Sequence, residues 1–226
     1  MKTKLLIAIL AVLALPSFAQ KKVSILGDSY STYGGLVSPS WNLCWYNGTD
    51  GGGKEKNNDV KEPEQTWWNI VIKDMGYALE KNNSFSGSTV CYTGYRKEDY
   101  SDRAFITRMP NLGNPDIILI LGGTNDSWAG APIGEYQWEG WTRADLYSFR
   151  PAFCLMISYL KQNYPDARIV NICNSELKPE VTETERVVCE HYGVEHILLH
   201  DIDKQWGHPS NAGMRAIAEQ VEAFIR

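Results

Sequence analysis

Three polar residues of the chain have side chains that acyl transfer requires. Each follows a short apolar run: Ser29 in "SILGDS", Asn125 in "LILGGTND" and His208 in "LLHDIDKQWGHPS". A serine hydroxyl is a poor nucleophile until a base such as histidine takes its proton, and an asparagine amide can donate a hydrogen bond to the oxyanion that forms. These residue types therefore indicate nucleophilic attack on a carbonyl carbon, provided that the fold brings them together.

Each of these motifs, taken alone, also suits a structural role. The triplet that ends at Ser29 is compatible with a turn or a helix N-cap, and Asn125 with a turn that precedes a cap at Asp126. A lone histidine such as His208 is more often structural than catalytic. The functional interpretation depends on where the three residues lie relative to the strands.

The segments that must position these residues alternate between strand and helix patterns. Strands are predicted at 23–26, 116–121, 167–173 and 195–200, and helices at 66–79, 143–163, 180–191 and 209–225. This alternation predicts an α/β fold with a central parallel sheet flanked by helices. Ligands of such folds bind beyond the carboxyl ends of the strands, which is where the three polar residues stand. The polar stretch 47–65 is predicted to be a long surface loop, a kind that usually serves a site.

Four blocks, in this order, resemble the markers of the SGNH hydrolase family, the GDSL-type esterases and lipases. They contain Ser29, Gly87 in "NNSFSGS", Asn125 and His208. The resemblance extends over nearly the whole chain after residue 19 and implies a three-layer flavodoxin-like fold. It also implies that Ser29 is the nucleophile and His208 its base. The implied oxyanion hole consists of the backbone N–H groups of Ser29 and Gly87 with the Asn125 side-chain amide.

The acid of the catalytic triad departs from the family pattern. The family usually has an aspartate three residues before the histidine, and this chain has Gln205 there. We predict that Asp203 orients His208, with Asp201, Gln205 or a backbone carbonyl in a Ser-His dyad as the alternatives. A neutral acceptor can orient an imidazole, but it stabilises the imidazolium less than a carboxylate does.

Composition argues against several other functions. The formal net charge is −5 and the basic residues are scattered, so no nucleic-acid partner is expected. His191, His196 and His200 lack the cysteines or carboxylates that would complete a four-ligand set, so neither a metal nor another cofactor is expected. The expected partner is a small-molecule or glycan ester, and no oligomeric state is predicted.

The first residues, "MKTKLLIAILAVLALPSFAQ", have the pattern of a secretory signal peptide cleaved after Ala19. We therefore expect export to the periplasm or the exterior, with residues 20–226 forming a single SGNH hydrolase-like domain. The apolar run at 5–15 is short for a membrane span, and no later segment approaches the ~20 apolar residues that a spanning helix needs. An uncleaved anchor is the alternative.

The chain has five cysteines with no regular spacing, so at least one remains outside any intramolecular pair. Export permits a disulfide such as Cys44 with Cys91, although the sequence leaves the pairing open. Cys154 and Cys173 stand in apolar surroundings and are expected in the core.

Two of the eight tryptophans, Trp128 and Trp206, directly neighbour the polar motifs. Their rings could stack on sugar faces, or they could simply cover loops. Export, aromatic surroundings and the lack of a long aliphatic run favour an esterase that removes small acyl groups, such as acetyl groups on glycans. The alternatives are a glycan-binding protein with weak or no turnover and a lipase or thioesterase.

Overall fold

The computed structural model describes residues 20–48, 50 and 52–226, so the predicted signal peptide at 1–19 lies outside the described residues. The described residues form a five-stranded parallel sheet of order β2-β1-β3-β4-β5. Its strands are β1 (Lys22–Gly27), β2 (Ala78–Asn82), β3 (Ile117–Gly122), β4 (Arg168–Cys173) and β5 (Glu195–Leu198). The helices are α1 (Trp67–Asp74), α2 (Phe105–Arg108), α3 (Thr124–Ala129), α4 (Phe149–Asn163), α5 (Pro179–Tyr192) and α6 (Asn211–Ile225).

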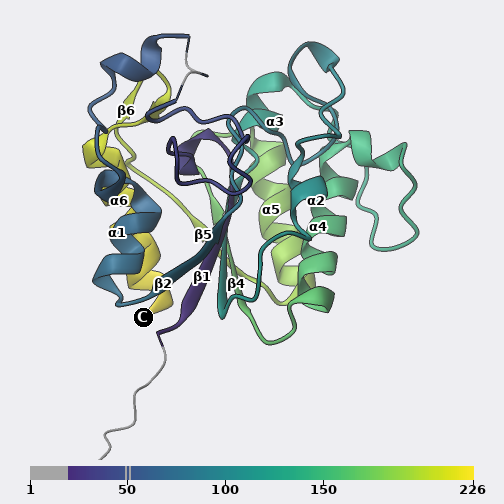
Figure 1. Cartoon of the computed structure of the whole chain (residues 1–226). Coiled ribbons are helices and arrows are strands. Elements are labelled where there is room, and N and C mark those ends of the chain that lie inside the picture. The colour runs from purple at the N-terminus through teal and green to yellow at the C-terminus, as the bar shows by residue number, and fades with distance from the viewer. Residues whose placement is uncertain (1–19, 49, 51) are drawn as a thin grey trace, which may run out of the picture.

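Helices cover both faces of the sheet, which gives three layers (Figure 1). Successive side chains of a strand point to opposite faces. In β3, Leu119 therefore joins the core beneath α1 and α6, whereas Ile118 and Ile120 join the core beneath α2, α4 and α5. Because both faces are buried, β3 reads as one continuous apolar run. The predicted α/β fold with a central parallel sheet is confirmed.

The predicted helix at 66–79 was too long. Helix α1 ends at Asp74, and the edge strand β2 follows at Ala78. The sequence of β2, "ALEKN", is charged and only partly buried because the strand pairs on one side alone, so it lacks the apolar run by which the other strands were recognised. The predicted helix at 143–163 begins later than expected, at Phe149, after a short 3-10 turn.

His208 lies on a small hairpin between β5 and α6, formed by β6 (Lys204–Gln205) and β7 (His208–Pro209). The two turn residues, Trp206 and Gly207, have φ values of 56° and 78°. A two-residue turn with positive φ at both positions matches the twist of a hairpin, and glycine adopts that conformation readily. Gln205, at the position where the family usually has an aspartate, therefore lies in β6 of this hairpin.

The predicted loop 47–65 packs against this hairpin. Asn58 donates to the carbonyl of Pro209 at 3.1 Å, and the backbone N–H of Asp59 donates to Gln205 Oε1 at 2.9 Å. The described part of the loop also contains short 3-10 turns at Lys54–Asn57 and Pro63–Gln65. The loop thus supports the segment that carries His208.

All five cysteines are buried free thiols in this structure, so Cys44 and Cys91 are not paired. Cys154 and Cys173 lie in the core, as predicted. No helix in the described ranges is long and apolar enough to cross a membrane.

Candidate active site

Ser29 and His208 lie 179 positions apart in the sequence and are in direct contact. The distance from Ser29 Oγ to His208 Nε2 is 3.0 Å. Both side chains are largely buried, with exposed fractions of 2% for Ser29 and 9% for His208. This is the distance at which a histidine can take the proton of a nucleophilic serine.

The turn that carries Ser29 follows directly from the end of β1. Asp28 Oδ1 accepts a hydrogen bond from the backbone N–H of Tyr30 at 3.0 Å and so caps a 3-10 turn over Ser29–Ser31. The Thr32 hydroxyl donates to the carbonyl of Ser29 at 3.0 Å. These local contacts fix the backbone of the serine at the carboxyl end of the sheet.

Two backbone N–H groups at the site are unpaired. Within the part of the chain that the structure describes, neither the N–H of Ser29 nor that of Gly87 has an acceptor. Both residues line the same cavity. Gly87 has a φ of 75°, a conformation that side chains disfavour, and lacks a Cβ that would crowd an approaching carbonyl. The arrangement suits an oxyanion hole.

The Asn125 side chain is held by three hydrogen bonds. Its Oδ1 accepts from the Tyr95 hydroxyl at 2.7 Å, and its Nδ2 donates to the carbonyl of Ser88 at 3.0 Å and to Asp28 Oδ2 at 3.3 Å. The Ser88 carbonyl can only accept, so the amide nitrogen must face it. Asn125 can therefore serve an oxyanion by exchanging its longest contact, the one with Asp28.

Asp126 and Arg108 hold the separate segments of the site together. The Asp126 carboxylate accepts from the backbone N–H groups of Val90 at 2.8 Å and Cys91 at 3.2 Å. These bonds connect the stretch of chain that follows Gly87 to α3. Arg108 donates through Nη2 to the carbonyl of Gly27 at 3.1 Å and to the Ser88 hydroxyl at 2.8 Å. Burial raises the pKa of Asp126 to about 6 and lowers that of Arg108 to about 9.

The other nitrogen of the imidazole faces the hairpin turn. His208 Nδ1 lies 3.2 Å from the carbonyl oxygen of Trp206, so it donates its hydrogen there when Nε2 accepts from Ser29. Burial lowers the pKa of His208 to about 4, and the Trp206 carbonyl opposes this shift. A neutral imidazole with Nε2 free to accept a proton is the form that a general base requires.

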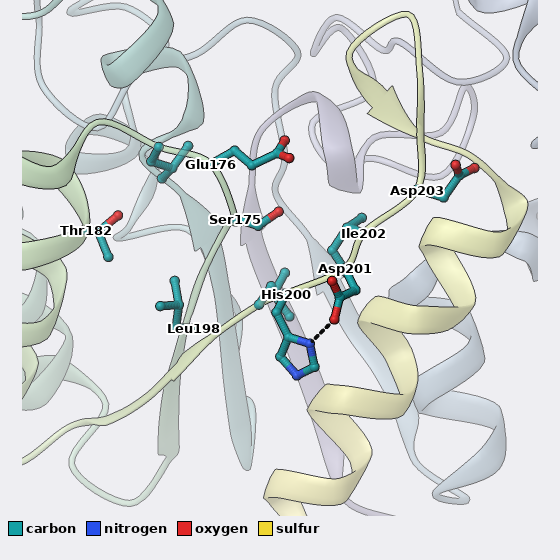
Figure 2. Close-up of a pocket in the computed structure, with 10 residues that line it drawn as sticks. Ser175, Glu176, Thr182, Leu198, His200, Asp201, Ile202 and Asp203 are labelled. Carbon is teal, nitrogen blue, oxygen red and sulfur yellow. Dashed lines mark hydrogen bonds and ion pairs between the residues drawn. The ribbon is translucent and has the colours of Figure 1, made fainter.

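The structure does not bring Asp203 to His208, which corrects the predicted triad. The Asp203 carboxylate instead accepts from the hydroxyl of Ser210, the N-cap residue of α6. Figure 2 shows Asp203 near the start of α6 and Asp201 directed toward His200. The side-chain oxygen of Gln205 accepts a hydrogen bond from the backbone of loop 47–65 and, among the described residues, none from His208. Of the four alternatives, the backbone carbonyl is the one that contacts His208 in the described residues.

Aromatic rings surround the imidazole. Trp45 stacks on it with ring centroids 3.9 Å apart, and Tyr30, Tyr46 and Trp128 approach it from other sides. Trp128 and Trp206 line the cavity over Ser29. Sequence reasoning missed the roles of Tyr95, Arg108 and Trp45, since only the three-dimensional contacts distinguish these residues from the other aromatic and basic side chains.

The cavity over Ser29 has a volume of about 240 Å³. Its lining also includes Asp50 and Lys54, which come from loop 47–65. Among residues 20–48, 50 and 52–226, no cluster of histidine, cysteine or carboxylate side chains could hold a metal ion. The chemistry of the described site is that of a serine, a histidine and hydrogen-bond donors.

The family model described as GDSL-like lipase/acylhydrolase matches residues 21–225. The chain belongs to this family of ester hydrolases. A candidate GDSL-like lipase from Bacteroides uniformis is 65% identical, with a TM-score of 0.88 over 91% of this chain and 95% of that one. A second, from Bacteroides ovatus, is 50% identical, with a TM-score of 0.88 over 92% of this chain and 99% of that one. A comparison with curated protein sequences gives no significant match.

The fold also recurs in more distant structures. A family two carbohydrate esterase from Clostridium thermocellum, solved in complex with cellohexaose, is 20% identical with a TM-score of 0.61 over 94% of this chain and 66% of that one. An acetyl xylan esterase from Butyrivibrio proteoclasticus is 17% identical with a TM-score of 0.56 over 94% of this chain and 65% of that one. At these identities the likeness shows the fold alone.

Proposed function

We propose that the protein is an exported serine esterase that removes small acyl groups, acetyl above all, from carbohydrates through a Ser29-His208 dyad. The observation that carries this proposal is the 3.0 Å contact between Ser29 Oγ and His208 Nε2 beside the unpaired N–H groups of Ser29 and Gly87. A nucleophile, its base and an oxyanion hole are the parts that ester hydrolysis needs.

In the proposed first step, Ser29 Oγ attacks the ester carbonyl carbon while His208 Nε2 takes the hydroxyl proton. The electron pair of the carbonyl π bond moves to its oxygen, which the two backbone N–H groups and Asn125 stabilise. When this tetrahedral intermediate collapses, the bond to the alcohol oxygen breaks and His208 returns the proton to that oxygen. Water then attacks the acyl-serine in the same way, which releases the carboxylic acid and restores Ser29.

The size of the cavity supports a short acyl chain. Its volume of about 240 Å³ lies below the roughly 300–1,000 Å³ usual for sites that bind drug-sized ligands. Trp45 lies across His208 and is buried, with an exposed fraction of 4%. An acetyl group leaves room in such a space for part of the alcohol, whereas an octanoyl chain would fill most of it.

The outer part of the cavity supports a carbohydrate as the alcohol. Trp128 and Trp206 line it with exposed fractions of 45% and 60%, so their rings are accessible to a ligand. Aromatic faces suit the C–H surfaces of a sugar ring, while Asp50 and Lys54 offer polar partners for hydroxyl groups. The structures of distant carbohydrate esterases agree with this proposal but do not carry it.

The experiment is an acyl-chain and glycan panel on residues 20–226. We expect kcat/KM to fall from acetyl to octanoyl aryl esters, and acetate to be released from acetylated oligosaccharides. Activity that rises with chain length would favour a lipase or thioesterase. Binding of the oligosaccharide without acetate release would favour a glycan-binding protein.

Export is a separate part of the proposal, and it rests on residues 1–19 alone. Expression of the full chain in a bacterium, followed by fractionation and N-terminal sequencing, should give a protein that begins at Gln20 outside the cytoplasm. A full-length protein that stays in the inner membrane would favour the uncleaved anchor.

A further inference from the structure

Trp45 stacks directly on the imidazole of the catalytic base. Its indole and the imidazole of His208 are nearly parallel, with an interplanar angle of 7° and ring centroids 3.9 Å apart. Both side chains are buried. A cation close to the face of an indole is stabilised by the negative potential above that ring, and the effect is stronger when water is excluded.

His208 must carry a positive charge during each half of the proposed reaction, because it holds the serine or water proton. In a complete triad, a carboxylate compensates that charge. Here the hydrogen-bond partner of Nδ1 is the neutral carbonyl of Trp206. The imidazolium therefore needs stabilisation from another source.

We propose that Trp45 supplies this stabilisation as a positioning residue: its indole face holds the His208 ring in place and stabilises the imidazolium that a triad carboxylate would otherwise compensate. The inference rests on the proposed esterase function. Trp45 takes no proton and forms no bond to the substrate in this account, because the proton moves only between Ser29, His208 and the leaving alcohol or water.

The backbone of Trp45 is hydrogen-bonded to the turn that carries Ser29. The backbone N–H of Trp45 donates to Thr32 Oγ1 at 2.9 Å, and the same hydroxyl donates to the carbonyl of Ser29 at 3.0 Å. Tyr46 packs edge-on against Trp45 and donates from its hydroxyl to the carbonyl of Pro209 at 2.7 Å. The indole is thus fixed relative to both members of the dyad.

None of the other described side chains around His208 stacks on its imidazole as Trp45 does. Tyr30 approaches the imidazole from the nucleophile turn and donates to the carbonyl of Gly207 at 2.7 Å. Asp50, Lys54 and Tyr95 line the same cavity but make no hydrogen bond to His208 in the described residues. Tyr46 and Trp128 present ring edges at centroid distances of 6.4 Å and 6.1 Å.

The test is a series of mono-, di- and trifluorinated tryptophans placed at position 45 alone. Fluorine withdraws electron density from the indole face with little change in ring shape, so packing is retained while attraction for a cation weakens. We expect kcat for an aryl acetate to fall stepwise, by about 10-fold to 30-fold across the series. The pKa of His208, followed by NMR of its imidazole, should fall in parallel because the charged form loses stabilisation.

The variants Trp45→Phe and Trp206→Leu complete the design. Phenylalanine keeps an aromatic face with weaker attraction for a cation, so its kcat should lie between those of the parent and the trifluorinated protein. Trp206→Leu keeps the backbone carbonyl and should raise KM for an acetylated glycan without shifting the pKa of His208.

A constant kcat and a constant pKa of His208 across the fluorinated series would overturn the inference. Labelling of Ser29 by a serine-directed phosphonate in the same proteins distinguishes this from failure of the proposed function. If Ser29 is labelled in every protein but neither kcat nor the pKa of His208 depends on fluorination, then Trp45 only packs against His208. A parent protein that is neither labelled nor active would overturn the proposed function and the inference with it.

Discussion

Two hollows beyond the carboxyl ends of the sheet each contain a serine and a histidine. They differ in how deeply these residues are buried and in whether the two side chains are in contact. The first holds Ser29 and His208, buried and in contact. The second, shown in Figure 2, has a volume of about 620 Å³ and is lined by Ser175, His200 and Asp201 among others. By residue type alone, the second resembles a catalytic triad as closely as the first, whose lining also includes Asp50.

Geometry removes that resemblance. His200 Nδ1 lies 2.9 Å from Asp201 Oδ2, but the two side chains are 71% and 95% exposed, so water weakens this contact. The Ser175 hydroxyl oxygen accepts from Lys204 Nζ at 3.4 Å and, among the described residues, makes no hydrogen bond to His200. Burial, a base in contact with the nucleophile and unpaired N–H donors distinguish the first hollow, whereas the presence of an acid does not.

The largest expected effect separates the two serines. Ser29→Ala should lower kcat on an aryl acetate by about 10⁴-fold or more, because loss of a nucleophile leaves only the residual catalysis of the binding site. The matched variant Ser175→Ala should retain the parent kcat. Steady-state assays of both proteins, with circular dichroism as the folding control, make the comparison. Equal loss in the two variants would contradict the assignment.

The next effect concerns the oxyanion hole. Asn125→Ala should lower kcat by about 10²-fold to 10³-fold. Tyr95→Phe removes only the hydrogen bond that orients the amide, so kcat should fall by about 10-fold with little change in KM. Burial raises the pKa of Tyr95, so its hydroxyl remains a donor at neutral pH. The double variant should be no slower than Asn125→Ala alone, and additive losses would show that Tyr95 acts elsewhere.

The pH dependence sharpens the contrast between a buried and an exposed histidine. Only neutral His208 can accept the serine proton, and burial lowers its pKa to about 4 from the ordinary 6.5. kcat/KM should therefore show a rise near pH 4 that belongs to His208. A histidine with an ordinary pKa would be about 90% protonated at pH 5.5. The absence of a rise near pH 4, in protein shown to be folded, would contradict the burial of the base, whereas a further step between about pH 6 and 7 would report the buried carboxyls of Asp126 and Asp28.

The smallest expected effect on rate is that of Asp203→Asn. Since this carboxylate contacts Ser210 and not His208, kcat should remain within about threefold of the parent, whereas neutralising a triad acid can cost about 10⁴-fold. The free energy of unfolding should fall by about 1 kcal/mol, because a charge-assisted bond to the N-cap of α6 is weakened. Denaturant titration and steady-state kinetics test both parts, and a large loss of kcat in stable protein would restore Asp203 to the triad.

The sequence predicted the sheet and proposed Ser29 and His208 as partners, for reasons that also explain what it missed. Strands buried on both faces, such as β3, have apolar runs that can be recognised without a structure, whereas the charged edge strand β2 does not. Ser29 and His208 were predicted because their motifs follow strand-like segments and resemble, in order, the markers of the family. Asp203 was misplaced because the positive-φ turn at Trp206 and Gly207 sets the path of the chain, and spacing alone did not reveal that hairpin.

The most direct test of the central claim is labelling of the folded protein with a serine-directed phosphonate. Intact mass and peptide mapping should show one adduct per chain on Ser29, and none in Ser29→Ala. Labelling should be markedly slower in His208→Ala and unchanged in His200→Ala. An adduct on Ser175, or an active protein with no adduct at Ser29, would contradict the account.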